Sequence, residues 1–340
     1  MKAVVVCPGR GTYGKGELGS LLRLHGAKRD LLAGYEAIRA EAGQDSLTAL
    51  DGAARFEVAR HTRGDNASAL IHAMTVADVR DLRGVEVVAV TGNSMGWYSA
   101  LAVAGALAPV EGFRLANGMG ALMQAALIGG QLVYPHMGDD WRPDPARKAG
   151  LLALVGEIGA RPGHVFALSI DLGGMLVLAG NEAGLAAFEA AVPKAGQFPL
   201  RLPNHAAFHT ALQAPVAAQG QAAFRGLPWQ QPKVPMIDGR GEIWWPRASD
   251  LGALADYTLG HQVVAAYDFT RAIAVAAREF APDLFIVTGP GTTLGGAVAQ
   301  SLVLAGWRGM RSKDDFMARQ AERPLLVSMG REDQRGLVTG

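Results

Sequence analysis

Cysteine and charge are both scarce in this chain of 340 residues. The single cysteine, Cys7, excludes an internal disulfide framework and a thiolate metal cluster. The formal net charge is only +1, so the sequence gives no reason to expect nucleic acid or an anionic membrane surface as a partner. Asp, Glu, Lys and Arg together make up 19% of the residues, against about a quarter in ordinary soluble domains.

The shortage of charge is concentrated in four long windows that contain no Asp, Glu, Lys or Arg. These windows are Val87–Val110, Leu115–Gly138, Leu202–Phe224 and Leu284–Trp307. The first, second and fourth are 24 residues long, which is enough for a membrane-spanning helix of about 20 residues. Gly, Pro, Asn, Gln or Ser interrupts each one, however, and the N-terminus lacks the apolar core of a signal peptide. We therefore expect a cytoplasmic globular protein with no membrane span, a large core and one or two domains.

Strand-like and helix-like segments alternate along most of the chain, which is typical of an α/β fold. The apolar run Lys2–Cys7 and the β-branched run Val85–Thr91 predict two buried strands. Pro109 is well placed to begin a helix that runs toward Ile128. The tail after Arg308 is charged, and we expect it to be peripheral.

The order of elements changes between Gln131 and Leu202. Here the pattern predicts strand, helix, strand, strand, helix, strand, with a hairpin turn at Asp171–Gly174. That order is typical of a ferredoxin-like module. We therefore predict a large α/β body formed by residues 1–128 and 203–340, into which a small α+β subdomain of residues 129–202 is inserted.

The sharpest motif is a Gly-x-Ser-x-Gly turn between a predicted strand and a predicted helix. It reads Gly92-Asn93-Ser94-Met95-Gly96. A nucleophile on such a tight turn needs very small residues two positions away on either side, which Gly92 and Gly96 supply. Ser94 would then lie at a helix N-terminus, where the N–H of Met95 and the helix dipole can stabilise an oxyanion. An ordinary glycine-rich turn is the alternative interpretation.

A serine nucleophile needs a general base, and the chain contains eight histidines. Five of them are predicted to lie on surface helices, loops or a strand of the small module, and we treat these as ordinary: His25, His61, His72, His136 and His164. Three remain: His205, His209 and His261. His209 stands out because it precedes a predicted helix inside an uncharged window. Spacing cannot select a base, since triad partners are neighbours in space, so a structural histidine remains the alternative.

Two more glycine-rich turns follow predicted strands. The first, Gly9–Gly14, contains Gly-x-Gly-x-x-Gly and has Asp30 farther along, so a dinucleotide site has to be considered. Pro8 at the end of the strand and Lys15-Gly16, where a helix should begin, argue against it. Such a loop can instead present backbone N–H groups to an oxyanion. The second turn, Gly289-Pro290-Gly291, is by itself most simply a strand-to-helix connection.

Taken in order, these segments resemble the malonyl-CoA:acyl-carrier-protein transacylase family, which includes the acyltransferase domains of fatty acid and polyketide synthases. The family's Phe-Pro-Gly-Gln-Gly-Ser corresponds to residues 7–12, and its Gly-His-Ser-Leu-Gly-Glu-Tyr-Ser-Ala-Leu to residues 92–101. Its Ala-Phe-His-Ser/Thr matches residues 207–210, and its Gly-Pro-Gly-x-x-Leu matches residues 289–294. The resemblance extends from about Lys2 to Leu304. It implies an α/β-hydrolase-like body with an inserted ferredoxin-like subdomain.

The resemblance implies a role for each matched residue. Ser94 would take an acyl group from a coenzyme A thioester, with His209 as general base. A backbone carbonyl, by position that of Gln262, would orient the imidazole in place of an aspartate. The N–H groups of Met95 and Arg10 would form the oxyanion hole. The acyl group would then pass to the phosphopantetheine thiol of an acyl carrier protein with ping-pong kinetics, without a cofactor or metal.

Three departures from the family pattern concern the acyl pocket. Malonyl-specific members hold the free carboxylate of the acyl group with the arginine of an Arg-Gly-x-x-Met-Gln-like segment. When Met123-Gln124 is aligned with the Met-Gln of that segment, Met119 takes the position of the arginine. A desolvated carboxylate without a partner is costly, so we predict a monoacyl group and not malonyl. Arg114 could bind a carboxylate only if the helix register differs. Asn93 replaces the family's histidine and Trp97 its glutamate, with Trp97 either shaping the pocket or serving as core.

We therefore predict an acyl-CoA:acyl-carrier-protein acyltransferase with altered acyl specificity. A thioester hydrolase that uses the same Ser94 and His209 is the alternative, with water replacing the carrier thiol. A non-catalytic carrier-binding protein is a third hypothesis, which the retention of both residues opposes. An NAD-binding protein is a fourth, carried only by the first glycine-rich loop. The sequence leaves the acyl chain, the carrier protein, the pathway and the oligomeric state open, a monomer included.

Overall fold

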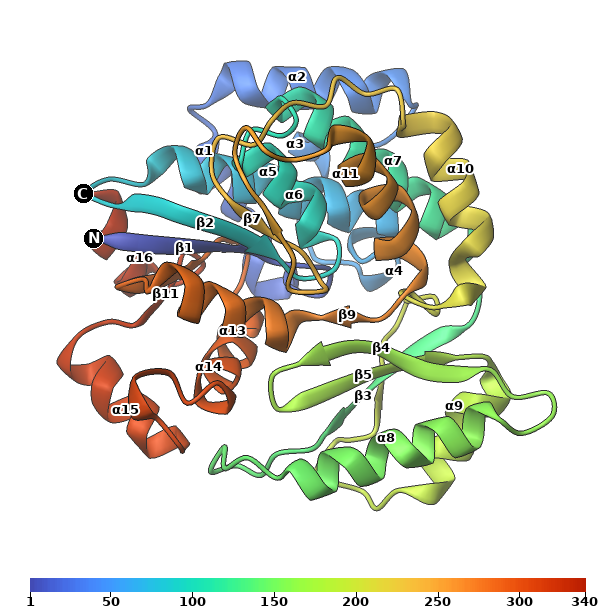
Figure 1. The fold of residues 1–340 in the computed structure, drawn as a ribbon. Coiled ribbons are helices and arrows are strands. Elements are labelled where there is room, and N and C mark those ends of the chain that lie inside the picture. The colour runs from blue at the N-terminus through green and yellow to red at the C-terminus, as the bar shows by residue number, and fades with distance from the viewer.

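The larger of two sheets has the strand order β11-β10-β1-β2-β7-β8 (Figure 1). The computed structural model describes all residues, 1–340. The strands of this sheet are β1 (Lys2–Cys7), β2 (Glu86–Gly92), β7 (Met236–Ile237), β8 (Ile243–Trp244), β10 (Leu284–Val287) and β11 (Leu326–Ser328). All neighbours pair in parallel except β8, which runs antiparallel to β7 at one edge. The predicted strands Lys2–Cys7 and Val85–Thr91 are confirmed as β1 and β2.

Helices cover both faces of this sheet, with α5, α6 and α7 on one side and α13 and α14 on the other (Figure 1). This coverage explains why β1 is fully buried from Ala3 to Cys7 and apolar at every one of those positions. No helix is both long enough and apolar enough to cross a membrane. The helices of the body are α1 (Ser20–His25), α2 (Arg29–Glu41), α3 (Leu47–Asp51), α4 (Val58–His61), α5 (Gly64–Asp81), α6 (Gly96–Val103), α7 (Pro109–Ala126), α10 (Ala214–Phe224), α11 (Leu251–Asp256), α12 (Gln262–Val264), α13 (Phe269–Phe280), α14 (Thr293–Leu304), α15 (Lys313–Glu322) and α16 (Glu332–Thr339).

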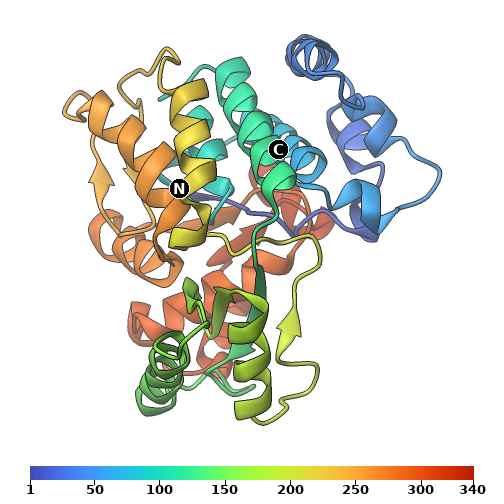
Figure 2. The ribbon, with the colours of Figure 1, turned by 90° about the vertical axis from the view of Figure 1, so that its right-hand side faces the viewer.

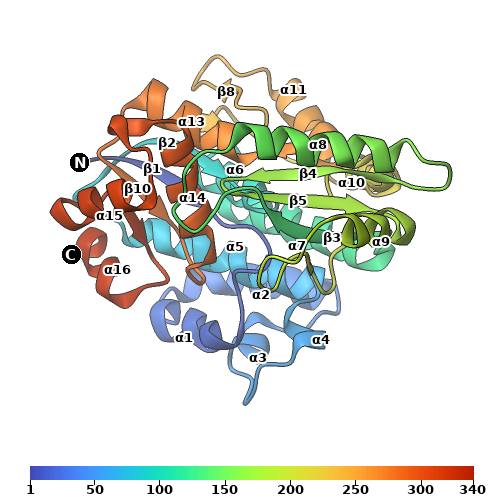
Figure 3. The ribbon, with the colours of Figure 1, turned by 90° about the horizontal axis from the view of Figure 1, so that it is seen from below.

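The smaller sheet has the order β6-β3-β5-β4-β9, and its two helices pack on one face (Figures 2 and 3). Its elements are β3 (Gly130–Pro135), α8 (Pro145–Gly159), β4 (Phe166–Leu172), β5 (Met175–Gly180), α9 (Glu182–Ala191), β6 (Leu200–Arg201) and β9 (Tyr267–Asp268). The predicted order of strand, helix, strand, strand, helix, strand is confirmed along the chain. β9 comes from the body and pairs in parallel with β4, so the two parts of the protein share this sheet. The proposed subdomain boundaries stay a prediction.

Histidine exposure was predicted wrongly at four positions. His25, His61, His72 and His136 are buried, and only His164 among the five is partly exposed. Three of these four rings, those of His25, His72 and His136, have hydrogen-bond partners far away in the sequence. His25 Nε2, for example, lies 2.9 Å from Asp78 Oδ1, and His136 Nε2 lies 2.9 Å from the Gly173 carbonyl oxygen.

The charged tail is not peripheral, which corrects the prediction for the residues after Arg308. β11 pairs with β10 in the larger sheet, and α16 is tied to α5 through Arg335. The Arg335 guanidinium pairs with Asp78, a fully buried carboxylate that also accepts the Gly289 N–H at 2.6 Å. Because a buried carboxylate needs a cation close by, the charge of the tail is what anchors it.

Replacing Arg335 with alanine is expected to lower the free energy of unfolding by roughly 3 kcal/mol, because Asp78 then stays buried without this cation. The control is Arg331→Ala, since the ion pair of Arg331 with Asp333 is exposed and should contribute less than about 1 kcal/mol. Urea denaturation followed by circular dichroism measures both values. Equal effects at the two positions would show that α16 is not held through Asp78.

Candidate active site

The turn between β2 and α6 presents Ser94 in a left-handed backbone conformation, with φ of +55°. An ideal Cβ on Gly92 would lie 2.3 Å from the carbonyl carbon of Gly96. A Cβ on Gly96 would lie 2.1 Å from the carbonyl oxygen of Cys7, at the end of β1. Both contacts are impossible, so the argument that this turn needs glycine at the two positions is confirmed. The close approach also brings the loop after β1 beside Ser94.

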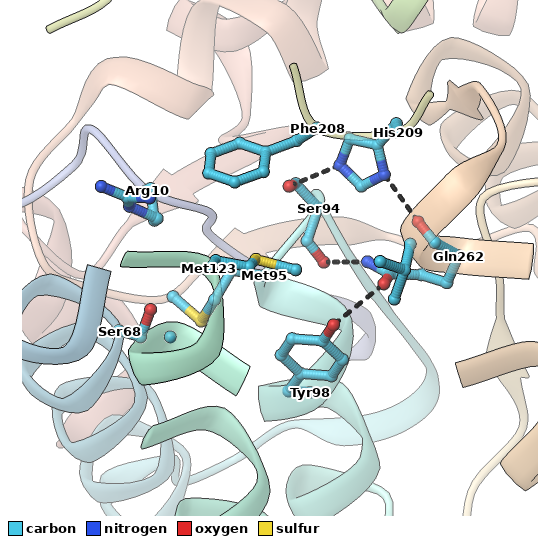
Figure 4. Close-up of a pocket in the computed structure, with 11 residues that line it drawn as sticks. Arg10, Ser68, Ser94, Met95, Tyr98, Met123, Phe208, His209 and Gln262 are labelled. Carbon is cyan, nitrogen blue, oxygen red and sulfur yellow. Dashed lines mark hydrogen bonds between the residues drawn. The ribbon is translucent and has the colours of Figure 1, made fainter. Parts of the chain in front are cut away.

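Ser94, His209 and Gln262 come together from three separate parts of the chain (Figure 4). The Ser94 Oγ lies 2.7 Å from Nε2 of His209, and Nδ1 of His209 lies 2.7 Å from the carbonyl oxygen of Gln262. A carbonyl oxygen only accepts hydrogen bonds, so Nδ1 carries the ring proton. Nε2 is therefore the acceptor for the Ser94 hydroxyl, which is the arrangement that activates a serine nucleophile. His205 and His261 are not hydrogen-bonded to Ser94.

Burial sets the charge state of the imidazole. Removal from solvent lowers the pKa of His209 to about 4, and the hydrogen bond to the Gln262 carbonyl opposes this shift. The ring is therefore neutral at pH 7 and free to accept a proton. No carboxylate is hydrogen-bonded to His209, so the carbonyl dipole of Gln262 alone orients it.

The side chain of Gln262 forms a second set of contacts at the site (Figure 4). Its Nε2 donates to the carbonyl oxygen of Ser94 at 3.1 Å, and its Oε1 accepts from the hydroxyl of Tyr98 at 3.1 Å. Gln262 thus holds the backbone of the serine with its side chain and the ring of the histidine with its backbone. Sequence reasoning missed Tyr98, although its place four residues after Ser94, one turn along α6, is a signal that could have drawn attention.

Two backbone N–H groups beside the nucleophile have no acceptor within the protein. They belong to Met95 and Arg10, the residues that the family resemblance predicts for the oxyanion hole. The Asn93 N–H donates to the Cys7 carbonyl oxygen at 2.9 Å and ties the loop after β1 to the nucleophile turn.

The loop after β1 continues into a three-residue 3-10 helix, η1 (Lys15–Glu17), and not into a long helix. Gly291, with φ of +72°, packs against the Thr12 carbonyl behind it.

A cavity with an empty volume of about 360 Å³, part of it open to solvent, adjoins the Ser94 hydroxyl. Its lining mixes apolar side chains with a few polar ones. The lining residues are Arg10, Ser68, Ser94, Met95, Tyr98, Gly120, Met123, Phe208, His209, Gln262 and Val263.

None of the three residues assigned to the acyl pocket lines this cavity, which corrects that expectation. Trp97 is fully buried, and its Nε1 donates to Oγ1 of Thr258 at 2.9 Å. Met119 is also fully buried, and its sulfur faces Gly220 of α10. Asn93 lies against Gly9 in the loop after β1. All three residues therefore lie outside the set of side chains that line the cavity.

Comparisons with known proteins identify the fold. No family model and no curated protein matches the chain. The acyl-carrier-protein S-malonyltransferase of Burkholderia pseudomallei is 22% identical with a TM-score of 0.77, over 99% of each chain. The malonyl-CoA:acyl carrier protein transacylase of Xanthomonas oryzae is 21% identical with a TM-score of 0.77, over 98% of this chain and 96% of that one.

A malonyl-transacylase solved in complex with its type II PKS acyl-carrier protein is 20% identical, with a TM-score of 0.73, over 95% of this chain and 99% of that one. At these identities the likeness establishes the fold. The chain therefore has the fold of the malonyl-CoA:acyl-carrier-protein transacylases, as the sequence motifs predicted.

The pH dependence of Ser94 reactivity checks the charge state of His209. The rate of labelling by a fluorophosphonate is expected to stay level from about pH 8 to about pH 5, and to fall toward about pH 4 as the ring is protonated and ceases to be a base. Tryptophan fluorescence in the same buffers reports whether the protein is still folded. An acid limb near the ordinary histidine pKa of about 6.5 would contradict the buried, neutral ring.

Tyr98→Phe tests the hydrogen bonds of Gln262. Loss of the hydroxyl leaves the buried Oε1 of Gln262 unpaired, so we expect the labelling rate to fall about 10-fold. The matched control is Tyr134→Phe, which removes a buried hydroxyl that donates to the Pro193 carbonyl at 2.7 Å, away from the site. If both variants lose similar stability and Tyr98→Phe still labels at the wild-type rate, then the tyrosine only supports the fold.

Proposed function

We propose that the protein moves an acyl group from a coenzyme A thioester to the phosphopantetheine thiol of an acyl carrier protein, through an ester on Ser94. The observation that carries this is the 2.7 Å contact between Ser94 Oγ and His209 Nε2. It lies on the transacylase fold, beside two unpaired backbone N–H groups and a small cavity. The chain is in this proposal a divergent member of the transacylase family.

Acylation begins when Ser94 Oγ attacks the thioester carbonyl carbon and its proton passes to Nε2 of His209. The N–H groups of Met95 and Arg10 receive the oxyanion of the tetrahedral intermediate, and one such donor typically lowers the barrier by about 3 kcal/mol. The carbon–sulfur bond then breaks, and the departing sulfur takes the proton from the imidazolium. The product is an ester on Ser94 and free coenzyme A.

Transfer repeats the sequence with a new nucleophile. The phosphopantetheine thiol gives its proton to His209, and the sulfur attacks the ester carbonyl carbon. The ester carbon–oxygen bond breaks, and Ser94 Oγ recovers the proton from the imidazolium. In both half-reactions the Gln262 carbonyl stabilises the positive ring, so no aspartate is required. The cycle is therefore ping-pong and uses no cofactor.

The carrier protein and the finer architecture belong to the same proposal. One matched transacylase was solved in complex with its acyl-carrier protein, which supports a carrier as the acceptor here. We describe the body as α/β-hydrolase-like, because a serine follows a parallel strand on a tight turn. We describe the smaller part as ferredoxin-like, because its own strands have the order β6-β3-β5-β4 with the connectivity given above.

For the acyl group, the sequence proposes a monoacyl chain because Met119 stands where malonyl-specific members carry arginine. Met119 is uncharged, and it does not reach the cavity because it is buried against α10. Arg114, the other candidate on α7, is engaged at the surface with Glu41 at 3.4 Å and Glu111 at 3.5 Å. Neither of these α7 side chains therefore offers a cation to the acyl group, which supports the proposal of a monoacyl group and not malonyl.

The test is a two-stage mass measurement. Incubation with a panel of acyl-CoAs should add one acyl group to the intact protein, mapped to Ser94 and absent in Ser94→Ala, and holo-acyl carrier protein should then remove it. The Ser94→Ala rate should fall by a factor of at least about 1,000. Free acid in place of acyl-carrier product would favour the thioester hydrolase instead. Absence of any adduct with a folded protein would contradict both.

A further inference from the structure

His205 is a histidine that the proposed mechanism leaves unused. It lies four residues before His209, outside the matched motif of residues 207–210, and it does not line the cavity next to Ser94. It lines a second cavity instead, which has an empty volume of about 500 Å³, part of it open to solvent. Much of the remaining lining is apolar or aromatic and comes from Tyr13, Ala67, Leu202 and Pro203.

A chain of hydrogen bonds fixes the position of the proton on the His205 ring. The Ser169 hydroxyl donates to the Phe208 carbonyl oxygen at 2.8 Å, so its oxygen accepts from Nε2 of Gln131, which lies 2.7 Å away. The other end of the Gln131 amide, Oε1, only accepts, and it lies 2.8 Å from Nδ1 of His205. Nδ1 therefore carries the ring proton, and Nε2 keeps its lone pair.

The His205 ring is also neutral at pH 7. Removal from solvent and the positive charge of Arg10 lower the pKa of His205 to about 3. The only hydrogen bond of the ring is the one at Nδ1, so Nε2 has no partner within the protein. A neutral imidazole with a free Nε2 accepts a hydrogen bond there, so the ring can bind a ligand that brings an N–H or O–H group.

The other uncharged polar side chains of the second cavity already have partners. The Tyr13 hydroxyl donates to Oδ1 of Asp51 at 2.6 Å. The Thr62 hydroxyl donates to the Val58 carbonyl oxygen at 2.7 Å and accepts from Nδ2 of Asn204 at 2.7 Å. Nε2 of His205 is therefore the side-chain acceptor of this cavity that a ligand can use.

The second cavity adjoins the first, because Arg10 lines both. In the proposed reaction the Arg10 backbone N–H binds the oxygen of the thioester carbonyl at Ser94. The sulfur and the rest of the substrate must then lie outside the space that the acyl group fills. Figure 4 shows Arg10 on the side of Ser94 that faces away from Gln262, so the second cavity extends the site in that direction.

The thioester arm brings the donor that Nε2 of His205 lacks. In coenzyme A and in the phosphopantetheine group of a carrier, a short hydrocarbon spacer joins the sulfur to a secondary amide with one N–H. An amide N–H that leaves water needs a new acceptor, because an unpaired donor is costly to bury. The spacer meets apolar lining, and the amide meets the acceptor.

We propose that His205 is a substrate-binding residue whose Nε2 accepts a hydrogen bond from the amide N–H nearest the sulfur of the thioester arm. This inference rests on the proposed function and deepens it, since it concerns the arm and not the acyl group. Coenzyme A and the carrier share this amide, so His205 would serve both half-reactions. The second cavity would then favour thioesters of amide-bearing thiols over other thioesters.

The experiment compares two small acetyl thioesters that differ in one group. One is S-acetyl-N-acetylcysteamine, and in the other an ester oxygen replaces the amide N–H. The readout is the ratio of their kcat/KM values for acylation of Ser94, followed by the mass of the intact protein, because a general disturbance of the site slows both donors alike. The wild-type ratio is expected to favour the amide about 10-fold, and His205→Leu should abolish this preference.

Two further variants bracket that result. His205→Gln keeps an oxygen that can accept the amide N–H and should retain part of the preference. The matched control is His136→Leu, which removes another histidine that is hydrogen-bonded to a remote residue but lines neither cavity, and it should leave the preference unchanged. Absence of a preference in the wild type, or an unchanged preference in His205→Leu, would overturn the inference.

Calorimetric titration of Ser94→Ala with coenzyme A separates this inference from the proposed function. Adding His205→Leu should weaken binding about 10-fold. That loss, with no acylation of the wild type by either thioester, would support the inference and contradict the proposed function. Acylation of Ser94 with no amide preference would support the function and overturn the inference, and the absence of both acylation and His205-dependent binding would contradict both.

Discussion

The candidate site depends on one residue, Gln262, which holds both reactive groups at once. Ser94 and His209 have positive φ values of +55° and +58°, conformations that cost a non-glycine residue roughly 1 kcal/mol or more each. The hydrogen bonds of Gln262 to the Ser94 carbonyl and to the His209 ring offset part of this cost. They also fix the distance between nucleophile and base. The chemistry proposed for the site therefore depends on how firmly Gln262 itself is held.

The support for Gln262 comes from the five residues before it, Tyr257–His261, which form a π-helix, η3. Wider turns of this kind occur often at functional sites, because they redirect the residues that follow. Trp97 donates to Thr258 in this turn, and the Gly239 N–H donates to the hydroxyl of Tyr257 at 2.8 Å. Trp97 thus contributes to the site as an anchor for the π-helix, in agreement with the core role that the sequence left open beside contact with the acyl group.

Backbone geometry was more predictable from the sequence than side-chain surroundings. The turn needs glycine at position 92 for a local steric reason, its closeness to Gly96, and that reason can be read from five consecutive residues. The surroundings of Met119 and Arg10 depend instead on which remote segments pack against them. Gly220 meets Met119 from α10, and the carbonyl groups of Thr62 and Asn204 meet Arg10 from two different loops. No pattern along the chain records such contacts, so the main-chain role of Arg10 was predicted and its side chain was overlooked.

The shared edge of the smaller sheet has a mechanical consequence. Tyr267, in the two-residue strand β9, pairs with Ile170 of β4 and donates its hydroxyl to the Gly92 carbonyl at 2.6 Å. One short strand thus links the smaller sheet to the peptide just before the nucleophile turn. A hinge motion that swung the smaller sheet outward would pull on that peptide and disturb the alignment of the serine. In the proposed reaction, the flexibility needed for entry therefore has to come from the thioester substrate and not from a swing of the smaller sheet.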